Sequence, residues 1–465
     1  MSVKRFSAWL LILLVLLPLP AAYAGEAGSM WSVGFAAEAV LPDRDRLHNR
    51  EYFIAGYRSG YPATAMLDPQ YVRAVWLDDM SGEGGIILAA VDCVGLTSVD
   101  ISIIRGRLES FMKETGCRAV HICSTHTHAG IDTLGLWGPI AVSGRNEEFM
   151  ETLYTAAETA VRNAYSARKQ GRLFYGTAEL PEAFLRDSRE PRVVDCTLTS
   201  LHFQPEDGSS GLRMLHFPAH AEALRSANSK ISADYPGAMG RIIEEQTGDD
   251  FIYFTGAIGG LVMTEQLDAN VYASMDKTGR QLAWAAIEIE NEEELAPSLS
   301  AQTMSMDIPL DNTVFTVMQC LGVLRSDAVR GEGETGLAIR TQMSYLEIGG
   351  LPVILVPGEL FPELALGYPE DFTGDNAQAE NPPSFSEILG TDRFLVIGLA
   401  DDEVGYIVPP SDFRVNDTLP YLERANINGR SHYEETNSPG PETANVIART
   451  LEELIQSLRT TKDKE

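Results

Sequence analysis

Ala119-Val120-His121-Ile122-Cys123-Ser124-Thr125-His126-Thr127-His128-Ala129-Gly130 is the stretch around which this chain is organised. Its first residues are apolar enough to form a buried strand, and two histidines follow where that strand leaves the core. Residues two apart in an extended segment point to the same side, so His126 and His128 are expected to direct both imidazoles into one pocket. Such a pair suits a metal or proton-transfer site, provided that other ligand-type residues converge there.

Other apolar runs are also followed by residues that can bind a metal. His220 follows Leu212–Phe217, Glu359 follows Leu351–Val356, Tyr406 comes shortly after Arg393–Leu399, and Asp92 follows Ile86–Val91. In open α/β sheets, ligands gather at the carboxyl ends of the strands. Two imidazoles, one carboxylate and an open position make up a catalytic zinc site rather than a structural one. For Asp92, either orienting a ligand histidine or capping its strand is expected.

The rest of the chain alternates between strand-like and helical patterns. Helices are expected at 99–115, 146–169, 236–246, 271–290 and 443–458, and further strands at 31–41, 72–77, 193–203, 251–254, 301–310 and 336–348. This alternation predicts an α/β fold of mixed, layered β-sheets flanked by helices, with the zinc site at strand ends. Because no linker divides residues 25–465, we expect them to form a single domain.

The N-terminus and the overall charge bear on where the protein acts. Lys4-Arg5, the aliphatic run Leu10–Leu17 and Ala22-Tyr23-Ala24 predict a signal peptide over residues 1–24, and hence export to the periplasm or the exterior. An uncleaved N-terminal anchor is the alternative. The net charge of −30 disfavours nucleic acid as a partner. The five cysteines are too few and too scattered for a disulfide framework.

Several motifs together resemble the neutral/alkaline (non-lysosomal) ceramidases. Thr125–Gly130 is similar to the family's Thr-His-Thr-His-Ser-Gly-Pro hallmark, and Pro357-Gly358-Glu359 matches its Pro-Gly-Glu. Weaker similarities involve Pro218-Ala219-His220 with Ile231–Gly237, Tyr406–Phe413 and Tyr433-Glu434-Glu435. The order of these motifs agrees with the family from about Trp31 to Tyr433, and the resemblance implies a ceramidase catalytic-domain-like fold.

The resemblance also implies roles for individual residues. Zinc ligands are expected at His126, His220, Glu359 and Tyr406, with His128 as an acid/base or oxyanion-stabilising group, and with Arg186 and Tyr433 steadying the substrate carbonyl. The implied activity is hydrolysis of a linear amide, such as an N-acyl lipid, by an exported Zn²⁺ enzyme. The implied partner is a small-molecule or lipid amide substrate, through which the protein would contact a membrane peripherally, and no protein partner is implied.

The chain also departs from the family pattern. Ala129 and Ile131 replace a Ser and a Pro, and Ala257–Leu261 holds neither the Asp nor the Ser of the family's Gly-Asp-Val-Ser-Pro stretch. Because the chain ends soon after Tyr433, we expect no immunoglobulin-like C-terminal domain. Two alternatives remain: a non-catalytic envelope binding protein on a degenerate ceramidase scaffold, and an amidohydrolase-type (β/α)₈ barrel, which would need eight successive βα units.

Overall fold

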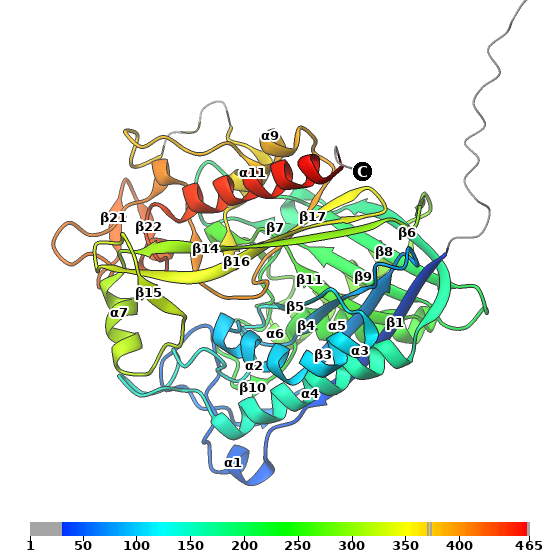
Figure 1. The fold of residues 1–465 in the computed structure, drawn as a ribbon. Helices are drawn as coiled ribbons and strands as arrows, with labels where there is room; N and C mark the ends of the chain where they lie inside the picture. Colours follow the sequence, from blue (N-terminus) through cyan, green and yellow to red (C-terminus); the bar gives the residue numbers. More distant parts are fainter. Residues whose placement is uncertain (1–29, 370–371, 373, 463–465) are drawn as a thin grey trace, which may run out of the picture.

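Two β-sheets packed face to face between helical layers form the body of the protein (Figure 1). A computed structural model describes residues 30–369, 372 and 374–462, so the predicted signal peptide lies outside the described residues. The α/β class of mixed, layered sheets flanked by helices is confirmed. Within the described ranges, we find no helix with both the length and the apolar character needed to cross a bilayer.

The larger sheet has nine strands and comes mostly from the first 300 residues. Its order is β11 (Asp250–Thr255), β9 (Leu212–Phe217), β8 (Thr197–Pro205), β6 (Lys169–Glu179), β1 (Trp31–Val40), β3 (Gln70–Asp78), β4 (Ile86–Val91) and β5 (Ala119–Ser124), with β13 (Glu293–Leu295) paired to β6. The pairs β4–β5 and β9–β11 are parallel and the others are antiparallel.

The second sheet has five strands. Its order is β14 (Leu299–Leu310), β16 (Leu337–Ile348), β17 (Leu351–Leu355) and β19 (Leu395–Ile397), with β15 (Ala328–Arg330) paired to β16. Only β17–β19 is parallel among these pairs. Because both sheets are open and mixed, the described residues do not form a (β/α)₈ barrel, and that alternative is wrong.

Short strand pairs and helices complete the fold. The pairs are β2 (Ala65–Met66) with β10 (Lys230–Ile231), β7 (Leu185–Arg186) with β12 (Met263–Thr264), β18 (Glu359–Leu360) with β20 (Tyr406–Ile407), and β21 (Ala425–Ile427) with β22 (Arg430–His432). The helices are α1 (Arg44–His48), α2 (Ser98–Arg107), α3 (Glu109–Thr115), α4 (Glu147–Ser166), α5 (Asp234–Thr247), α6 (Val271–Ile287), α7 (Thr313–Cys320), α8 (Pro362–Leu366), α9 (Phe385–Leu389), α10 (Tyr433–Thr436) and α11 (Thr443–Lys462).

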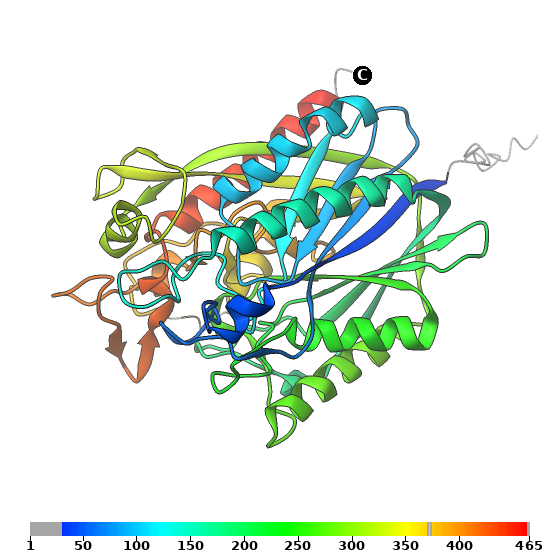
Figure 2. The same cartoon turned by 90° about the horizontal axis from the view of Figure 1, so that it is seen from below.

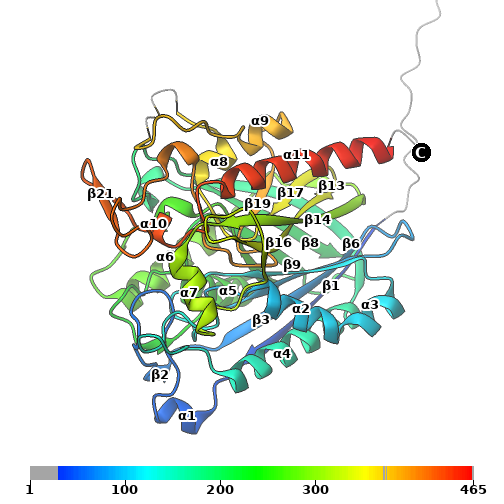
Figure 3. The same ribbon diagram turned by 60° about the vertical axis from the view of Figure 1, so that its left-hand side comes forward.

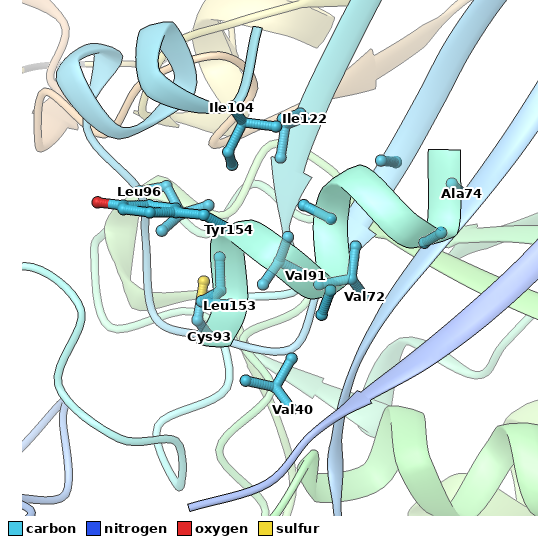
Figure 4. Close-up of a cluster of buried hydrophobic side chains, with 14 of the residues drawn as sticks. Val40, Val72, Ala74, Val91, Cys93, Leu96, Ile104, Ile122, Leu153 and Tyr154 are labelled. Carbon is cyan, nitrogen blue, oxygen red and sulfur yellow. The ribbon is translucent and has the colours of Figure 1, made fainter. Parts of the chain in front are cut away.

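Strands β4, β9 and β11 of the larger sheet are buried on both faces, which explains their continuous apolar runs. In β11, Phe251 and Tyr253 pack with α5 and α6, whereas Ile252 and Phe254 pack toward the second sheet. Figure 2 shows α4, α5 and α6 on the outer face of this sheet. Part of the α4 core, including Leu153 against the β4 face, is drawn in Figure 4. Helix α11 covers the outer face of the second sheet (Figure 1).

Several predicted boundaries are wrong because tertiary contacts override local pattern. The helix expected over 99–115 is divided between α2 and α3 at Leu108, whose backbone lies at φ −94° and ψ 0°. The helix expected to reach Lys169 ends at Ser166, since Lys169 pairs with Val33 of β1. The strand expected from Val193 begins only at Thr197, where pairing with β6 starts.

Candidate metal centre and active site

His126 and His128 follow β5 at a tight turn rather than in an extended segment. His126 has a φ of 61°, in the left-handed region that few residues other than glycine adopt. The extended geometry expected here is therefore wrong, but the two imidazoles still converge, with their Nε2 atoms 3.0 Å apart. The left-handed conformation costs on the order of 1 kcal/mol, so the surrounding packing has to hold His126 in place.

His220 reaches the same point from the end of β9. Its ring is fully buried, and its Nδ1–H donates to the carbonyl oxygen of Val262 at 2.8 Å. An isolated bridge pairs His220 with Met263, and another pairs Thr127 with Ala221. The bridge between Thr127 and Ala221 ties the segment after β9 to the turn after β5, which explains why the three histidine rings lie together.

Glu359 and Tyr406 come from the second half of the chain. They are direct partners in the parallel pair β18–β20, so the backbone ladder sets their separation. The Oε2 atom of Glu359 lies 3.0 Å from Nε2 of His220 and 3.5 Å from Nε2 of His126. The Tyr406 hydroxyl hydrogen bonds to the same carboxylate. The structure thus brings together His126, His220, Glu359 and Tyr406, the four residues expected to be metal ligands.

The donor atoms of this cluster fit a zinc ion. Nδ1 of His126 donates to the carbonyl of Val94 at 2.6 Å, as Nδ1 of His220 does to that of Val262, so the Nε2 atom of each ring faces the cluster and is the nitrogen available as a metal ligand. Backbone acceptors of this kind orient metal-binding histidines. The ligand nitrogens of His126, His128 and His220 lie within 4.8 Å of one another, and Glu359 adds a carboxylate. A cation bound among these atoms could be coordinated by each of them. Imidazole and carboxylate are both ligands of zinc.

Burial and mutual charge determine the protonation of the cluster. Burial lowers the pKa of His126 to about 4. Burial, together with the charges of the two neighbouring histidines, also holds the pKa of His128 well below its usual value. For His220, burial alone would lower the pKa, but the hydrogen bond and charge of Glu359 outweigh it, and the pKa is raised. Neutral His126 and His128 at neutral pH suit metal binding and proton acceptance.

A pocket opens beside the cluster. His126, His128, Glu359, Tyr406 and Tyr433 contribute its polar lining together with Glu403 and Asn437. Its other walls are mainly apolar and include Leu134, Leu136, Trp137, Phe315, Leu324, Ile339 and Val404. Helices α7 and α10, which supply Phe315 and Tyr433, lie at the same end of the molecule (Figure 3). The arrangement places an apolar surface next to a metal-type donor set.

Two expected residues lie elsewhere. Arg186 is exposed in the short strand β7 and is not among the residues that line the cavity. Asp92 accepts from the guanidinium of Arg73 at 2.8 Å and from the backbone N–H of Tyr71, so it stabilises the strand end. The structure therefore does not bring Arg186 to the cluster, and it gives Asp92 the capping role.

Two acidic residues that the sequence analysis missed lie at the site. Glu403 lines the cavity, and burial with the nearby charge of Glu359 raises its pKa well above the usual value. Glu222 is buried, and its Oε2 lies 3.6 Å from Nδ1 of His128. In a chain with 66 acidic residues, no local pattern separates these two from the others. The position of Glu222, two residues after His220, is the one signal that points to it.

The N-terminal part of the chain is similar in sequence to a known family. Residues 50–269 match the family model described as neutral/alkaline non-lysosomal ceramidase, N-terminal. The neutral ceramidase of Pseudomonas aeruginosa is 27% identical over 131 residues, which cover 25% of this chain and 20% of that protein. The matched stretch therefore spans about a fifth of that relative. The family-model match includes the three histidines and stops before Glu359.

Solved structures extend the similarity to nearly the whole fold. The crystal structure of the neutral ceramidase from Pseudomonas aeruginosa aligns with a TM-score of 0.72 at 16% identity, over 93% of this chain and 75% of that chain. A structure of a ceramidase complexed with C2 aligns with a TM-score of 0.71 at 15% identity, over 93% and 76%. At these identities the alignments establish the fold, and with the family model they confirm the resemblance predicted from the motifs.

Proposed function

We propose that this chain, a relative of the neutral/alkaline ceramidases, is an exported zinc-dependent hydrolase of linear amides that acts on an N-acyl lipid or a related N-acyl substrate. The observation that carries the proposal is the convergence of His126, His220 and Glu359 beside a largely apolar cavity. A donor set of this kind polarises a carbonyl through a metal, and the apolar walls suit an acyl chain. The leader over residues 1–24 is the basis for export.

In this proposal His126, His220, Glu359 and Tyr406 hold the metal. When bound, zinc supplies a Lewis acid that polarises the amide carbonyl and lowers the pKa of water toward neutrality. The hydrogen bonds from Nδ1 of both histidines to backbone carbonyls keep the ligand lone pairs in place. The pairing of β18 with β20 holds Glu359 beside Tyr406.

His128 is the residue that moves a proton. Its Nε2 lies at the edge of the donor cluster, and burial keeps its pKa low, so the ring is neutral and can accept a proton. In the breakdown of a tetrahedral adduct, Nε2 then returns that proton to the nitrogen of the departing amine. The leaving group departs as a neutral amine and the acyl group as a carboxylic acid, which then loses its proton to solvent.

Tyr433 stabilises the negative charge that develops on the carbonyl oxygen. It lines the cavity, and its ring centroid lies 6.2 Å from that of Tyr406. Burial raises the pKa of Tyr433 to about 12, so the hydroxyl keeps its proton and serves as a donor. The resemblance also implies that Arg186 steadies the carbonyl. For that, the exposed Arg186 side chain would have to move toward the cavity.

Metal analysis combined with activity tests the proposal. Purified wild type is expected to hold one zinc per chain and to cleave members of a panel of ceramides and other N-acyl amines in a chelator-sensitive reaction. His126→Ala and Glu359→Ala are expected to lose both zinc and activity, because each removes a ligand. The control is His48→Ala, which changes an exposed histidine at the end of α1.

The outcomes separate the remaining alternative from the proposal. Stoichiometric zinc with no turnover of any N-acyl compound would favour a binding protein on a ceramidase scaffold. Full activity in the absence of bound metal would refute the metal-dependent mechanism.

A further inference from the structure

Three side chains, those of Tyr57, Glu222 and Arg225, form a cluster behind His128, on the side away from the other histidines. The Tyr57 hydroxyl donates to Oε2 of Glu222 at 2.5 Å, and Nδ1 of His128 lies 3.6 Å from that same oxygen. The Tyr57 ring packs edge-on against the His128 ring at 5.3 Å between centroids. Arg225 contacts the other oxygen, Oε1, at 3.4 Å. Only 4% of Glu222 is exposed, so its carboxyl group has little contact with solvent.

The backbone fixes Glu222 opposite His128. The N–H of His128 donates to the carbonyl of Ala221 at 3.0 Å, next to the bridge between Thr127 and Ala221. The carboxylate of Asp234 accepts from the N–H groups of Ala223 and Leu224 at 2.9 and 3.0 Å, which holds the turn that follows Glu222. The contact with His128 is therefore a consequence of the fold and not of one mobile side chain.

The two oxygens of Glu222 have different surroundings. Oε1 faces Arg225, whose guanidinium also donates to the carbonyl of Thr264 and to the sulfur of Met263. Oε2 faces Tyr57 and His128. Nδ1 of His128 is buried and has no hydrogen-bond partner within the described residues. Oε2 of Glu222, 3.6 Å away, is an oxygen that can accept from Nδ1 if the two groups approach slightly.

We propose that Glu222 is a positioning residue that holds His128 in the tautomer with the proton on Nδ1, so that the Nε2 lone pair faces the metal-type cluster. A carboxylate next to one imidazole nitrogen fixes which nitrogen carries the proton and how the ring is oriented. This inference rests on the proposed function, because it concerns the proton-accepting role of His128. It adds Glu222 to the residues on which turnover depends. Tyr57 and Arg225 hold the Glu222 carboxylate in place through their contacts with its two oxygens.

A matched pair of variants tests the inference. Glu222→Met keeps the volume of the side chain but removes the acceptor, whereas Glu222→Gln keeps a carbonyl oxygen that can accept from Nδ1. We expect Glu222→Met to lower kcat on the order of 10–100-fold with little change in KM and with zinc retained. Glu222→Gln is expected to recover most of that loss. Glu206→Met, at an exposed glutamate, is the control.

A second readout does not depend on activity. In zinc-loaded protein labelled with ¹⁵N-histidine, and with His128→Ala to assign the signal, wild type and Glu222→Gln should show His128 protonated on Nδ1. Glu222→Met should shift the proton toward Nε2. If the wild type cleaves no amide, the proposed function fails while this spectrum still decides the inference.

Three results would overturn the role of Glu222. They are an unchanged His128 spectrum in Glu222→Met, a kcat equal to that of the wild type, and loss of zinc in Glu222→Met. The last would mean that Glu222 maintains the metal cluster itself.

Discussion

Glu363, in α8, carries a buried carboxyl group without a charge partner of its own. It is 2% exposed, and its Oε2 has no hydrogen-bond partner within the described ranges. Burial, reinforced by the negative charges of Asp187 and Asp412, raises its pKa to about 8 from an ordinary 4.5. The folded protein therefore holds a proton here that the unfolded chain has already released at neutral pH.

The sign of the pH dependence at Glu363 follows from linkage. Because the folded-state pKa is raised, the stability gained from this proton is fully present below pH 4.5 and is lost as the pH rises through 8. Glu363→Gln stays neutral at every pH, so we expect it to be more stable than the wild type above pH 8, by on the order of 3 kcal/mol. Urea unfolding from pH 5 to 9 measures this. The control is Glu332→Gln, at an exposed site. If the free energy of unfolding changes with pH in the same way in the wild type and in Glu363→Gln, the raised pKa of Glu363 is contradicted.

At single residues, the sequence predicts what stands directly after an apolar strand. His126, His220 and Glu359 were found in this way. In the structure, Oε2 of Glu359 lies 3.5 Å from Nε2 of His126 and 3.0 Å from Nε2 of His220. Arg186 was chosen by resemblance to a short motif, and its exposed position shows that the motif does not fix where the side chain lies. Glu222 belongs to the site through long-range pairing with the turn after β5, which no local pattern encodes.

At the scale of elements, the loop between α1 and β2 determines how His128 is packed. Gly56 in this loop has a φ of 100°, and a Cβ atom there would lie 2.5 Å from Cγ and Nδ1 of His128. Gly60 also has a positive φ, 67°, but a Cβ atom there would meet nothing closer than 3.7 Å. Both glycines have a left-handed backbone, but only a side chain at Gly56 would contact His128.

Alanine at each glycine should therefore have a different effect. Gly56→Ala displaces the His128 ring, and we expect it to lower activity on the order of 100-fold, because small misplacements of a reacting group are costly. Gly60→Ala should lower stability by about 1 kcal/mol through its left-handed backbone and leave kcat near that of the wild type. Activity assays and thermal unfolding of both variants measure this. Equal activities in the two variants would rule out the contact with His128 as the cause.

The sequence predicts the presence of elements better than their ends. The apolar runs of β4, β9 and β11 are long enough to identify, because these strands are buried on both faces. The two-residue strands β18 and β20, which carry Glu359 and Tyr406, are too short to leave a pattern. Their existence depends on pairing with each other, although they lie far apart in the sequence.

At the scale of the whole molecule, the proposed metal site connects the two halves of the fold. His126 and His220 follow strands of the larger sheet, whereas Glu359 and Tyr406 follow strands of the second sheet. The two sheets share a core that includes Leu88 and Met214 from the first and Leu346 and Val353 from the second. A metal held by residues from both halves adds its binding free energy to the packing that joins them.

Removing the metal should therefore lower the stability of the entire protein. A ligand present at 100 times its Kd stabilises the folded state by about 2.7 kcal/mol, so chelation is expected to lower the Tm by several degrees. In Glu359→Ala the chelator should have little effect on the Tm, while His48→Ala should respond as the wild type does. Differential scanning calorimetry with and without chelator measures these shifts. A wild-type Tm that is insensitive to both chelator and added zinc would contradict the proposed metal site.

The overall architecture was predictable only as a class. Alternation of strands and helices indicated layered sheets, but nothing local showed that β1 lies between β3 and β6, or that two open sheets stack. Such arrangements depend on contacts between residues hundreds of positions apart, such as the Trp31 indole donating to the carbonyl of Leu295 at 2.8 Å. The single-domain organisation of residues 25–465 stays a prediction.

The direct pairing of Glu359 with Tyr406 has a consequence for how this fold can diversify. Because two adjacent backbone segments set the spacing of these side chains, the chain between them can lengthen, shorten or change composition without moving them. Loops that shape the cavity are thus free to vary while the reactive groups keep their distances, so related chains can acquire new substrates through insertions alone.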